Sequence, residues 1–158
     1  MSITPCLWFP GTLAEALEFY TGLFPDSRVI SKQHYPDGSH RLLMAEWDML
    51  GTRFQGLNEK PGFPFTEAVS FAVACEDQAE VDRYWYGLIG ETGEESQCGW
   101  LKDRFGISWQ IVPKRMYDLL ADTNRARANA AMQAMLTMRR LVVADLEAAA
   151  DAAGEGQS

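Results

Sequence analysis

Two segments of this chain repeat each other, and this repeat limits the possible folds more than any other feature of the sequence. Residues 12–24 read TLAEALEFYTGLF and residues 77–89 read DQAEVDRYWYGLI, with Ala-Glu, an aromatic pair and Gly-Leu at matching places. Both segments space their apolar residues as an amphipathic helix does, and both begin with the capping-box pattern, Thr or Asp followed by Glu at the third residue after it. The sequence therefore predicts two helices in equivalent places of a duplicated architecture.

A second motif recurs downstream of each helix. Residues 48–55 read DMLGTRFQ and residues 103–110 read DRFGISWQ, so that Asp and Gly flank a turn that is followed by an aromatic residue and Gln. Gly tolerates positive φ and Asp hydrogen-bonds nearby backbone, which makes the pattern typical of a strand, a tight turn and a second strand. Other strands are predicted at residues 3–9, 28–35, 40–47, 68–75 and 109–112.

Together these elements predict an α+β fold built from two βαβββ units. Unit one covers residues 1–58, unit two covers residues 65–113, and a loop at 59–64 connects them. We expect the two units to form one domain over residues 1–113, followed by a helical C-terminal extension at 114–158. The extension is either a cap packed on the sheets or an arm that forms a homodimer, and its helices are predicted at residues 115–120, 124–138 and 141–153.

The charge and cysteine content disfavour several classes of protein. The 158 residues carry a net charge of −8 with a pI near 4.7, and an acidic surface repels nucleic-acid phosphates, so no nucleic-acid partner is expected. Three cysteines without a CxxC motif favour reduced thiols. The first residues lack the pattern of a signal peptide, and no stretch reaches the ~20 apolar residues of a membrane helix. These features predict a cytoplasmic protein without a membrane partner.

Three segments together resemble the PhnB-like group of the vicinal-oxygen-chelate (glyoxalase/bleomycin-resistance) superfamily, whose members often carry the label 3-demethylubiquinone-9 3-methyltransferase. They are TPCLWFPG at 4–11, FTEAVSFAVAC at 65–75 and QCGWLKDRFGISWQIVP at 97–113. The resemblance implies a curved mixed sheet of the glyoxalase/dihydroxybiphenyl-dioxygenase kind, in which two units form a cup. In enzymes of this superfamily the cup holds a divalent metal through a His on the first strand of a unit and a Glu on the last.

At those ligand positions this chain departs from the superfamily pattern. Residues 4–6 and 67–69 occupy the first-strand positions and contain no His, while Gln55 and Gln110 occupy the last-strand positions. Glutamine is neutral and a weak metal ligand, although its amide both donates and accepts hydrogen bonds. We therefore expect neither a catalytic metal nor another cofactor.

Other residues with metal-binding or nucleophilic chemistry lie outside those positions. His34 and His40 flank the turn at residues 36–38 and are interpreted as exposed strand-end residues, with a metal-binding pair as the alternative. Cys6 has no neighbouring base that the sequence reveals, which favours a partly buried thiol over a soft ligand or a nucleophile. Glu46 is interpreted as a surface carboxylate, with entry into the cup as the alternative.

The candidates for a ligand pocket are aromatic and neutral polar residues, namely Trp8, Gln55, Ser70, Trp100, Trp109 and Gln110. A neutral cup lined by indoles suits a small hydrophobic or aromatic ligand, so we expect a small-molecule-binding homodimer. No catalytic residue is identifiable. The alternatives are an enzyme of the methyltransferase, lyase or dioxygenase type and an interaction module that acts through the C-terminal helices. The usual S-adenosylmethionine site needs a Gly-rich turn after a parallel strand, and no GxGxG occurs here.

Overall fold

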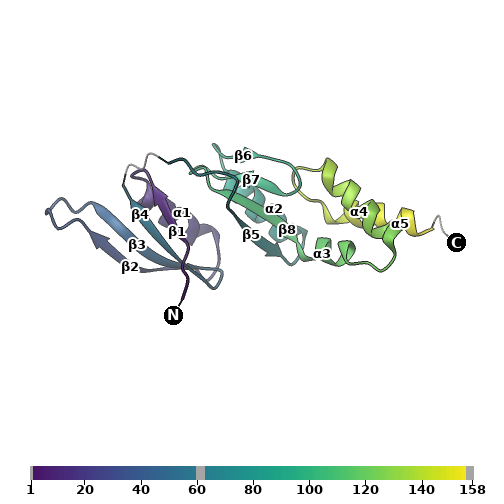
Figure 1. The fold of residues 1–158 in the computed structure, drawn as a ribbon, viewed down its shortest axis with the longest axis horizontal. Coiled ribbons are helices and arrows are strands. Elements are labelled where there is room, and N and C mark those ends of the chain that lie inside the picture. Colours follow the sequence, from purple (N-terminus) through teal and green to yellow (C-terminus); the bar gives the residue numbers. More distant parts are fainter. Residues whose placement is uncertain (1, 60–62, 156–158) are drawn as a thin grey trace. The chain divides into compact units, whose positions relative to one another are not determined.

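The structure is a computed structural model, and it describes residues 2–59 and 63–155 (Figure 1). The chain divides into two compact units, Met1–Pro64 and Phe65–Ser158, which are unit one and unit two from here on. Residues 60–62 of the predicted connecting loop lie outside the described residues. Within the described part of the chain, no helix is long and apolar enough to cross a membrane.

Unit one contains one helix and one mixed sheet of four strands in the order β1-β4-β3-β2. The first and last strands of the unit, β1 and β4, pair in parallel, and the other neighbours are antiparallel. The elements are β1 (Cys6–Phe9), α1 (Leu13–Leu23), β2 (Arg28–His34), β3 (Leu42–Met49) and β4 (Thr52–Asn58).

Unit two repeats this arrangement with the strand order β5-β8-β7-β6, and again its first and last strands pair in parallel. Its elements are β5 (Ser70–Cys75), α2 (Gln78–Ile89), β6 (Glu94–Glu95), β7 (Trp100–Lys102) and β8 (Ser108–Pro113). The same topology in both units confirms the α+β fold of two βαβββ units that the repeated motifs predict.

Each helix covers one face of its own sheet, and in unit one a glycine permits the close contact. Leu13 and Leu17 of α1 are buried together with Trp47 of β3. A Cβ added at Gly56 on β4 would lie 2.5 Å from Cδ1 of Leu13 and 3.1 Å from the Trp47 ring. Because real Cβ atoms do not approach so closely, the absence of a side chain at Gly56 allows α1 to pack directly on the sheet.

The start of α2 matches the predicted capping box. The carboxylate of Asp77 accepts the backbone N–H of Glu80 at 2.9 Å, and the Glu80 carboxylate accepts the backbone N–H of Glu76 at 2.8 Å. The first bond satisfies an N–H group that the first helical turn leaves without an intrahelical partner, and the second holds the residue before the N-cap. The local sequence pattern was therefore a reliable guide to this helix.

The capping box predicted at the start of α1 is wrong. Thr12 has φ −103° and ψ 12°, not the extended conformation of most N-cap residues, and its side chain makes no capping hydrogen bond within the described residues. Instead, Oδ1 of Asn58 accepts the backbone N–H of Leu13 at 3.0 Å, while its Nδ2 donates to the carbonyl of Leu42 at 2.9 Å. The end of β4 therefore caps the helix.

The repeated hairpin motif forms two different turns. In unit one, Leu50 and Gly51 both have positive φ, and Met49 pairs directly with Thr52, as in a tight two-residue hairpin. In unit two, Lys102 is instead the pairing partner of Ser108, so the loop is longer. This difference shifts the register of the last strand relative to the strand before it.

Three further helices complete unit two and share a core with the end of β8. They are α3 (Lys114–Leu120), α4 (Arg125–Thr137) and α5 (Val143–Glu155). Gln78 of α2 also holds this extension, since its Oε1 accepts the backbone N–H of Val143 at 2.8 Å. The buried cluster consists of Val112, Met116, Leu119, Ala131, Leu141, Leu146 and Ala150.

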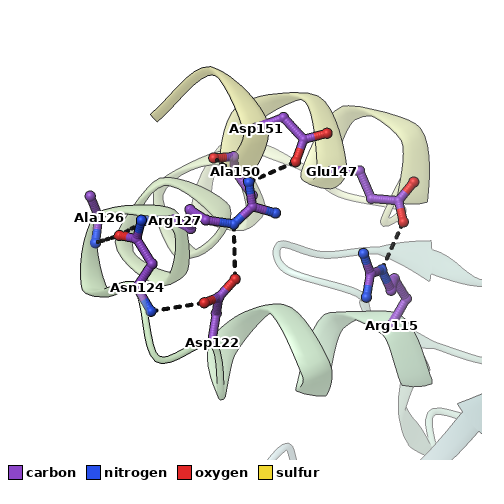
Figure 2. A network of polar contacts seen from close by, with 8 residues as sticks. All are labelled: Arg115, Asp122, Asn124, Ala126, Arg127, Glu147, Ala150 and Asp151. Atoms are coloured by element: carbon purple, nitrogen blue, oxygen red, sulfur yellow. Dashed lines mark hydrogen bonds and ion pairs between the residues drawn. The ribbon is translucent and has the colours of Figure 1, made fainter. Parts of the chain in front are cut away.

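Arg127 of α4 contacts both the α3–α4 loop and α5 through polar groups (Figure 2). Its Nε donates to Oδ2 of Asp122, after α3, at 2.9 Å, and its Nη1 lies 2.8 Å from Oδ1 of Asp151 on α5. Nη1 also donates to the carbonyl of Ala150 at 3.4 Å. A fork-shaped guanidinium can bind several acceptors at once, so one side chain links the α3–α4 loop to α5.

Candidate functional site

The face of each sheet that its helix leaves uncovered carries most of the candidate residues, and we call it the open face. In β1, Leu7 and Phe9 are buried, whereas Cys6 and Trp8 alternate with them and are exposed. The Trp8 indole is 39% exposed, and its ring centroid lies 6.0 Å from that of Phe63. Trp8 therefore presents an aromatic surface on the open face of unit one.

Gln55 lies on the same open face, between two strands that place polar groups beside it. It pairs across the ladder with Cys6 of β1 on one side and Glu46 of β3 on the other. Its Nε2 donates to Oε1 of Glu46 at 2.7 Å. Glu46, for which the sequence left two interpretations open, therefore orients the Gln55 amide.

The thiol of Cys6 is poorly suited to act as a nucleophile. Cys6 is an exposed residue, so the expected buried or partly buried thiol is wrong. The surrounding protein still desolvates the thiol in part and raises its pKa above that of an ordinary cysteine, so it is protonated near neutral pH. The alternative of an activated Cys6 thus gains no support from its surroundings.

The open face of unit two brings three of the candidates together. Nε2 of Gln110 donates to the hydroxyl of Ser70 at 2.8 Å, and Trp100 is the ladder partner of Gln110 on β7. In unit one the matching glutamine, Gln55, pairs with Glu46 instead. The longer second hairpin shifts the register of β7 against β8, and this shift brings Trp100 opposite Gln110. An indole in unit two therefore occupies the place of a carboxylate in unit one.

Trp109 lies on the opposite face from Gln110, because consecutive residues of a strand point to opposite sides of the sheet. It is 2% exposed, and its Nε1 donates to Oδ2 of the buried Asp103 at 2.8 Å. Its ring centroid is 5.5 Å from that of Phe71. Trp109 is a core residue on the helix side of unit two.

Both units have surface cavities. One in unit one, of about 470 Å³, is lined by Tyr35 and Arg41, and the Arg41 guanidinium lies 4.3 Å from the Tyr35 ring centroid. A cavity of about 120 Å³ in unit two includes Trp100 together with residues that the sequence interpretation missed, among them Lys102 and Ser108. Strand alternation could have identified both, since Lys102 follows Trp100 on β7 and Ser108 precedes Gln110 on β8 by two residues.

The side chains at the superfamily's ligand positions do not fit a divalent metal. Gln55 and Gln110 supply neutral amides at the last-strand positions, and residues 4–6 and 67–69 supply no imidazole at the first-strand positions. Over residues 2–59 and 63–155, no three side chains of His, Cys, Asp or Glu lie close enough together to hold a metal ion. His34 and His40 therefore form no such group with a third residue of these types in the described part of the chain. Divalent transition metals prefer imidazole, thiolate and carboxylate ligands, so these positions are better suited to hydrogen bonding.

Comparison with known proteins places the chain among proteins of similar fold. A family model described as 3-demethylubiquinone-9 3-methyltransferase matches residues 1–112. The structure of a PhnB protein from Bacillus cereus is 29% identical, with a TM-score of 0.66 over 72% of this chain and 99% of that chain. No curated protein matches the chain.

Two more distant structures share the fold alone. A protein from Pseudomonas aeruginosa is 20% identical, with a TM-score of 0.58 over 72% of this chain and 97% of its own. The fosfomycin resistance protein FosX from Mesorhizobium loti is 12% identical, with a TM-score of 0.52 over 70% of this chain and 90% of its own.

Proposed function

Because this chain belongs to the 3-demethylubiquinone-9 3-methyltransferase family, the PhnB-like group of the vicinal-oxygen-chelate superfamily, we propose that it binds a small aromatic or hydrophobic ligand without a catalytic metal. The observation that carries this proposal is the pair Gln55 and Gln110. They occupy equivalent places on two open faces, and each directs its Nε2 to a neighbour in its own sheet. Ordered amides beside an exposed indole in unit one and a half-buried indole in unit two suit recognition of a flat ligand by contact and hydrogen bonds.

The proposed ligand surface of each unit combines one indole with one ordered amide. In unit one these are Trp8 and Gln55, and in unit two they are Trp100 and Gln110. Neither pair supplies a group that ionises near neutral pH. Binding or sequestration requires no such group, whereas acid–base catalysis does.

The proposal includes a homodimer and a cytoplasmic location. Met132 and Leu136 are 42% and 51% exposed on α4, an apolar surface of the kind that a second copy of the chain would cover. The three cysteines are free, which suits a reducing compartment. Light scattering coupled to size-exclusion chromatography would measure the mass, and a monomer at all concentrations would contradict the dimer.

The test measures binding of flat aromatic compounds to the full chain, by calorimetry and by the change in melting temperature. We expect a hit to raise the melting temperature, because a ligand that binds only the folded state stabilises it. Gln110→Leu should weaken binding, whereas Tyr86→Leu, at an exposed residue of α2, should not. If both substitutions weakened binding equally, Gln110 would not be part of the ligand surface.

The methyltransferase activity in the family's description is the competing function. Experiments on the same purified protein distinguish ligand binding from methyl transfer. Saturable binding of S-adenosylmethionine with methyl transfer to an acceptor would replace the proposal by an enzyme. Stoichiometric metal in protein purified without chelator, with loss of ligand binding on its removal, would indicate a metal-dependent lyase or dioxygenase instead.

A further inference from the structure

The cavity of about 120 Å³ in unit two contains a buried hydroxyl with no hydrogen-bond partner among the described residues. It belongs to Ser108, which is 2% exposed and lines the cavity from β8. A buried polar group without a partner is unfavourable unless something else satisfies it. A polar ligand group that reached this hydroxyl would supply the missing partner.

The charges that surround this hydroxyl favour a cation. The lining includes Glu67, Glu94, Glu95 and Lys102. The Glu95 carboxylate accepts the indole N–H of Trp85 on the face that α2 covers, so the charges on the open face are the carboxylates of Glu67 and Glu94 and the ammonium group of Lys102. Glu67 and Lys102 form an ion pair with each other, which lowers the pKa of Glu67 and raises that of Lys102, so both stay charged at neutral pH. The excess of negative charge attracts a positively charged group.

The remaining carboxylates differ in how strongly they are engaged. Glu95 lies 3.4 Å from the guanidinium of Arg139 and accepts the indole N–H of Trp85 at 3.2 Å. Glu94 faces Lys102 across the β6–β7 ladder. A positive ligand group could therefore share Glu94 with Lys102 without breaking the contacts of Glu95.

The half-buried indole of Trp100 adds a second reason for a cation. Trp100 lines the same cavity and neighbours Gln110 across the ladder. The face of an indole attracts ammonium groups through its quadrupole. The cavity is smaller than the ~300 Å³ or more of a pocket for a whole ligand. Its size thus suits one amine-bearing group of a ligand whose flat part lies on the neighbouring open face.

We propose that this cavity binds the ammonium group of a small aromatic amine, with Ser108 as hydrogen-bond acceptor, Glu94 as counter-charge and Trp100 as the aromatic contact. This inference rests on the proposed function, because it names the ligand class for the same open face. It predicts that charge, and not only shape, decides which aromatic compounds bind.

Three probes of similar shape test the charge preference: benzylamine as the cation, benzyl alcohol as the neutral compound and phenylacetate as the anion. Binding to the full chain is followed by ¹H–¹⁵N NMR, with the indole signal of Trp100 as the local reporter. We expect benzylamine to bind about tenfold more tightly than either other probe, and added salt to weaken it. Equal binding of benzylamine and benzyl alcohol, or tighter binding of phenylacetate, would overturn the inference.

Two variants test the named groups. Glu94→Gln should weaken benzylamine binding about threefold to fivefold, whereas Glu91→Gln, an exposed residue outside the cavity with the same change in charge, should alter it less than about twofold. Ser108→Ala should weaken binding about fivefold while leaving the melting temperature unchanged or higher, because it removes a buried hydroxyl that lacks a partner. Unchanged benzylamine affinity in Glu94→Gln or Ser108→Ala would refute the site.

The outcomes separate the two proposals. If benzyl alcohol perturbs the Trp100 signal as strongly as benzylamine does, the chain binds aromatic ligands but the cation site is wrong. If none of the three probes binds and other flat compounds also fail, the binding function itself is wrong, and the cation site is wrong with it.

Discussion

The indole Nε1 of Trp109 donates a 2.8 Å hydrogen bond to Oδ2 of Asp103, and both residues are almost fully buried. The other carboxylate oxygen of Asp103 accepts the backbone N–H groups of Phe105 and Ile107 at 2.8 Å and 3.0 Å. One side chain thus closes the second hairpin and fixes the indole of β8. The equivalent residue of unit one, Asp48, is instead paired with Arg53 at the surface.

Asp103→Ala should lower the free energy of unfolding by about 3 kcal/mol, because it removes the acceptor of two buried donors, on Ile107 and Trp109, and of one half-buried donor, on Phe105. Urea denaturation followed by tryptophan fluorescence measures the change. Asp48→Ala, the same substitution at the matching position of the repeat, should have little effect, since exposed ion pairs contribute little. Similar losses in both variants would contradict the distinction between the two units.

Asn58→Ala should destabilise the chain by about 1–2 kcal/mol, because Asn58 caps α1 in place of Thr12. Thr12→Ala is the matched control and should leave the urea midpoint nearly unchanged. If Thr12→Ala is the more damaging of the two, the side chain of Thr12 caps the helix in solution after all.

Gly56→Ala should destabilise the chain by about 1–3 kcal/mol, since the new Cβ would lie 2.5 Å from Cδ1 of Leu13. Gly22→Ala in α1 should instead stabilise it by about 0.5–1 kcal/mol, because a Cβ there meets no described atom within 4 Å beyond its own helix. We expect Gly56→Ala to lower the melting temperature and Gly22→Ala to raise it. A stabilising Gly56→Ala would show that α1 does not approach β4 so closely.

The contact between Arg127 and Asp122 should make stability depend on pH in the acid range. The hydrogen bond from Arg127, followed by the backbone N–H of Asn124, lowers the pKa of Asp122 below its usual value. A lowered carboxyl pKa stabilises the folded state above the unfolded pKa of about 4, and this contribution disappears as the pH falls through the folded pKa.

The urea midpoint of the native protein and of Asp122→Asn, measured at pH 7 and at pH 3, tests this dependence. Asp122→Asn should be less stable than the native protein at pH 7, and the difference should shrink at pH 3. A difference that stays constant between the two pH values would show that the charge of Asp122 is not involved.

The alternation of side chains along a strand explains which candidate residues lie on an open face and which lie in the core. Gln55 and Gln110 lie on open faces, as their places in the repeated hairpin motif suggest, and the family resemblance is confirmed. Trp109 lies in the core because it is adjacent to Gln110 in the strand, so the two side chains point to opposite faces. Ser108 was missed because a serine in a strand carries no signal until its surroundings are known.

The sequence by itself determined the duplication, the positions of the helices and the places where the chain turns, because periodicity and turn chemistry are properties of neighbouring residues. The tertiary structure decided which distant residues meet. Two copies of one hairpin motif form turns of different length, and therefore Gln55 faces a carboxylate whereas Gln110 faces an indole. Asn58 caps a helix that begins far earlier in the chain. Such pairings depend on register and packing across the sheet, which no local pattern specifies.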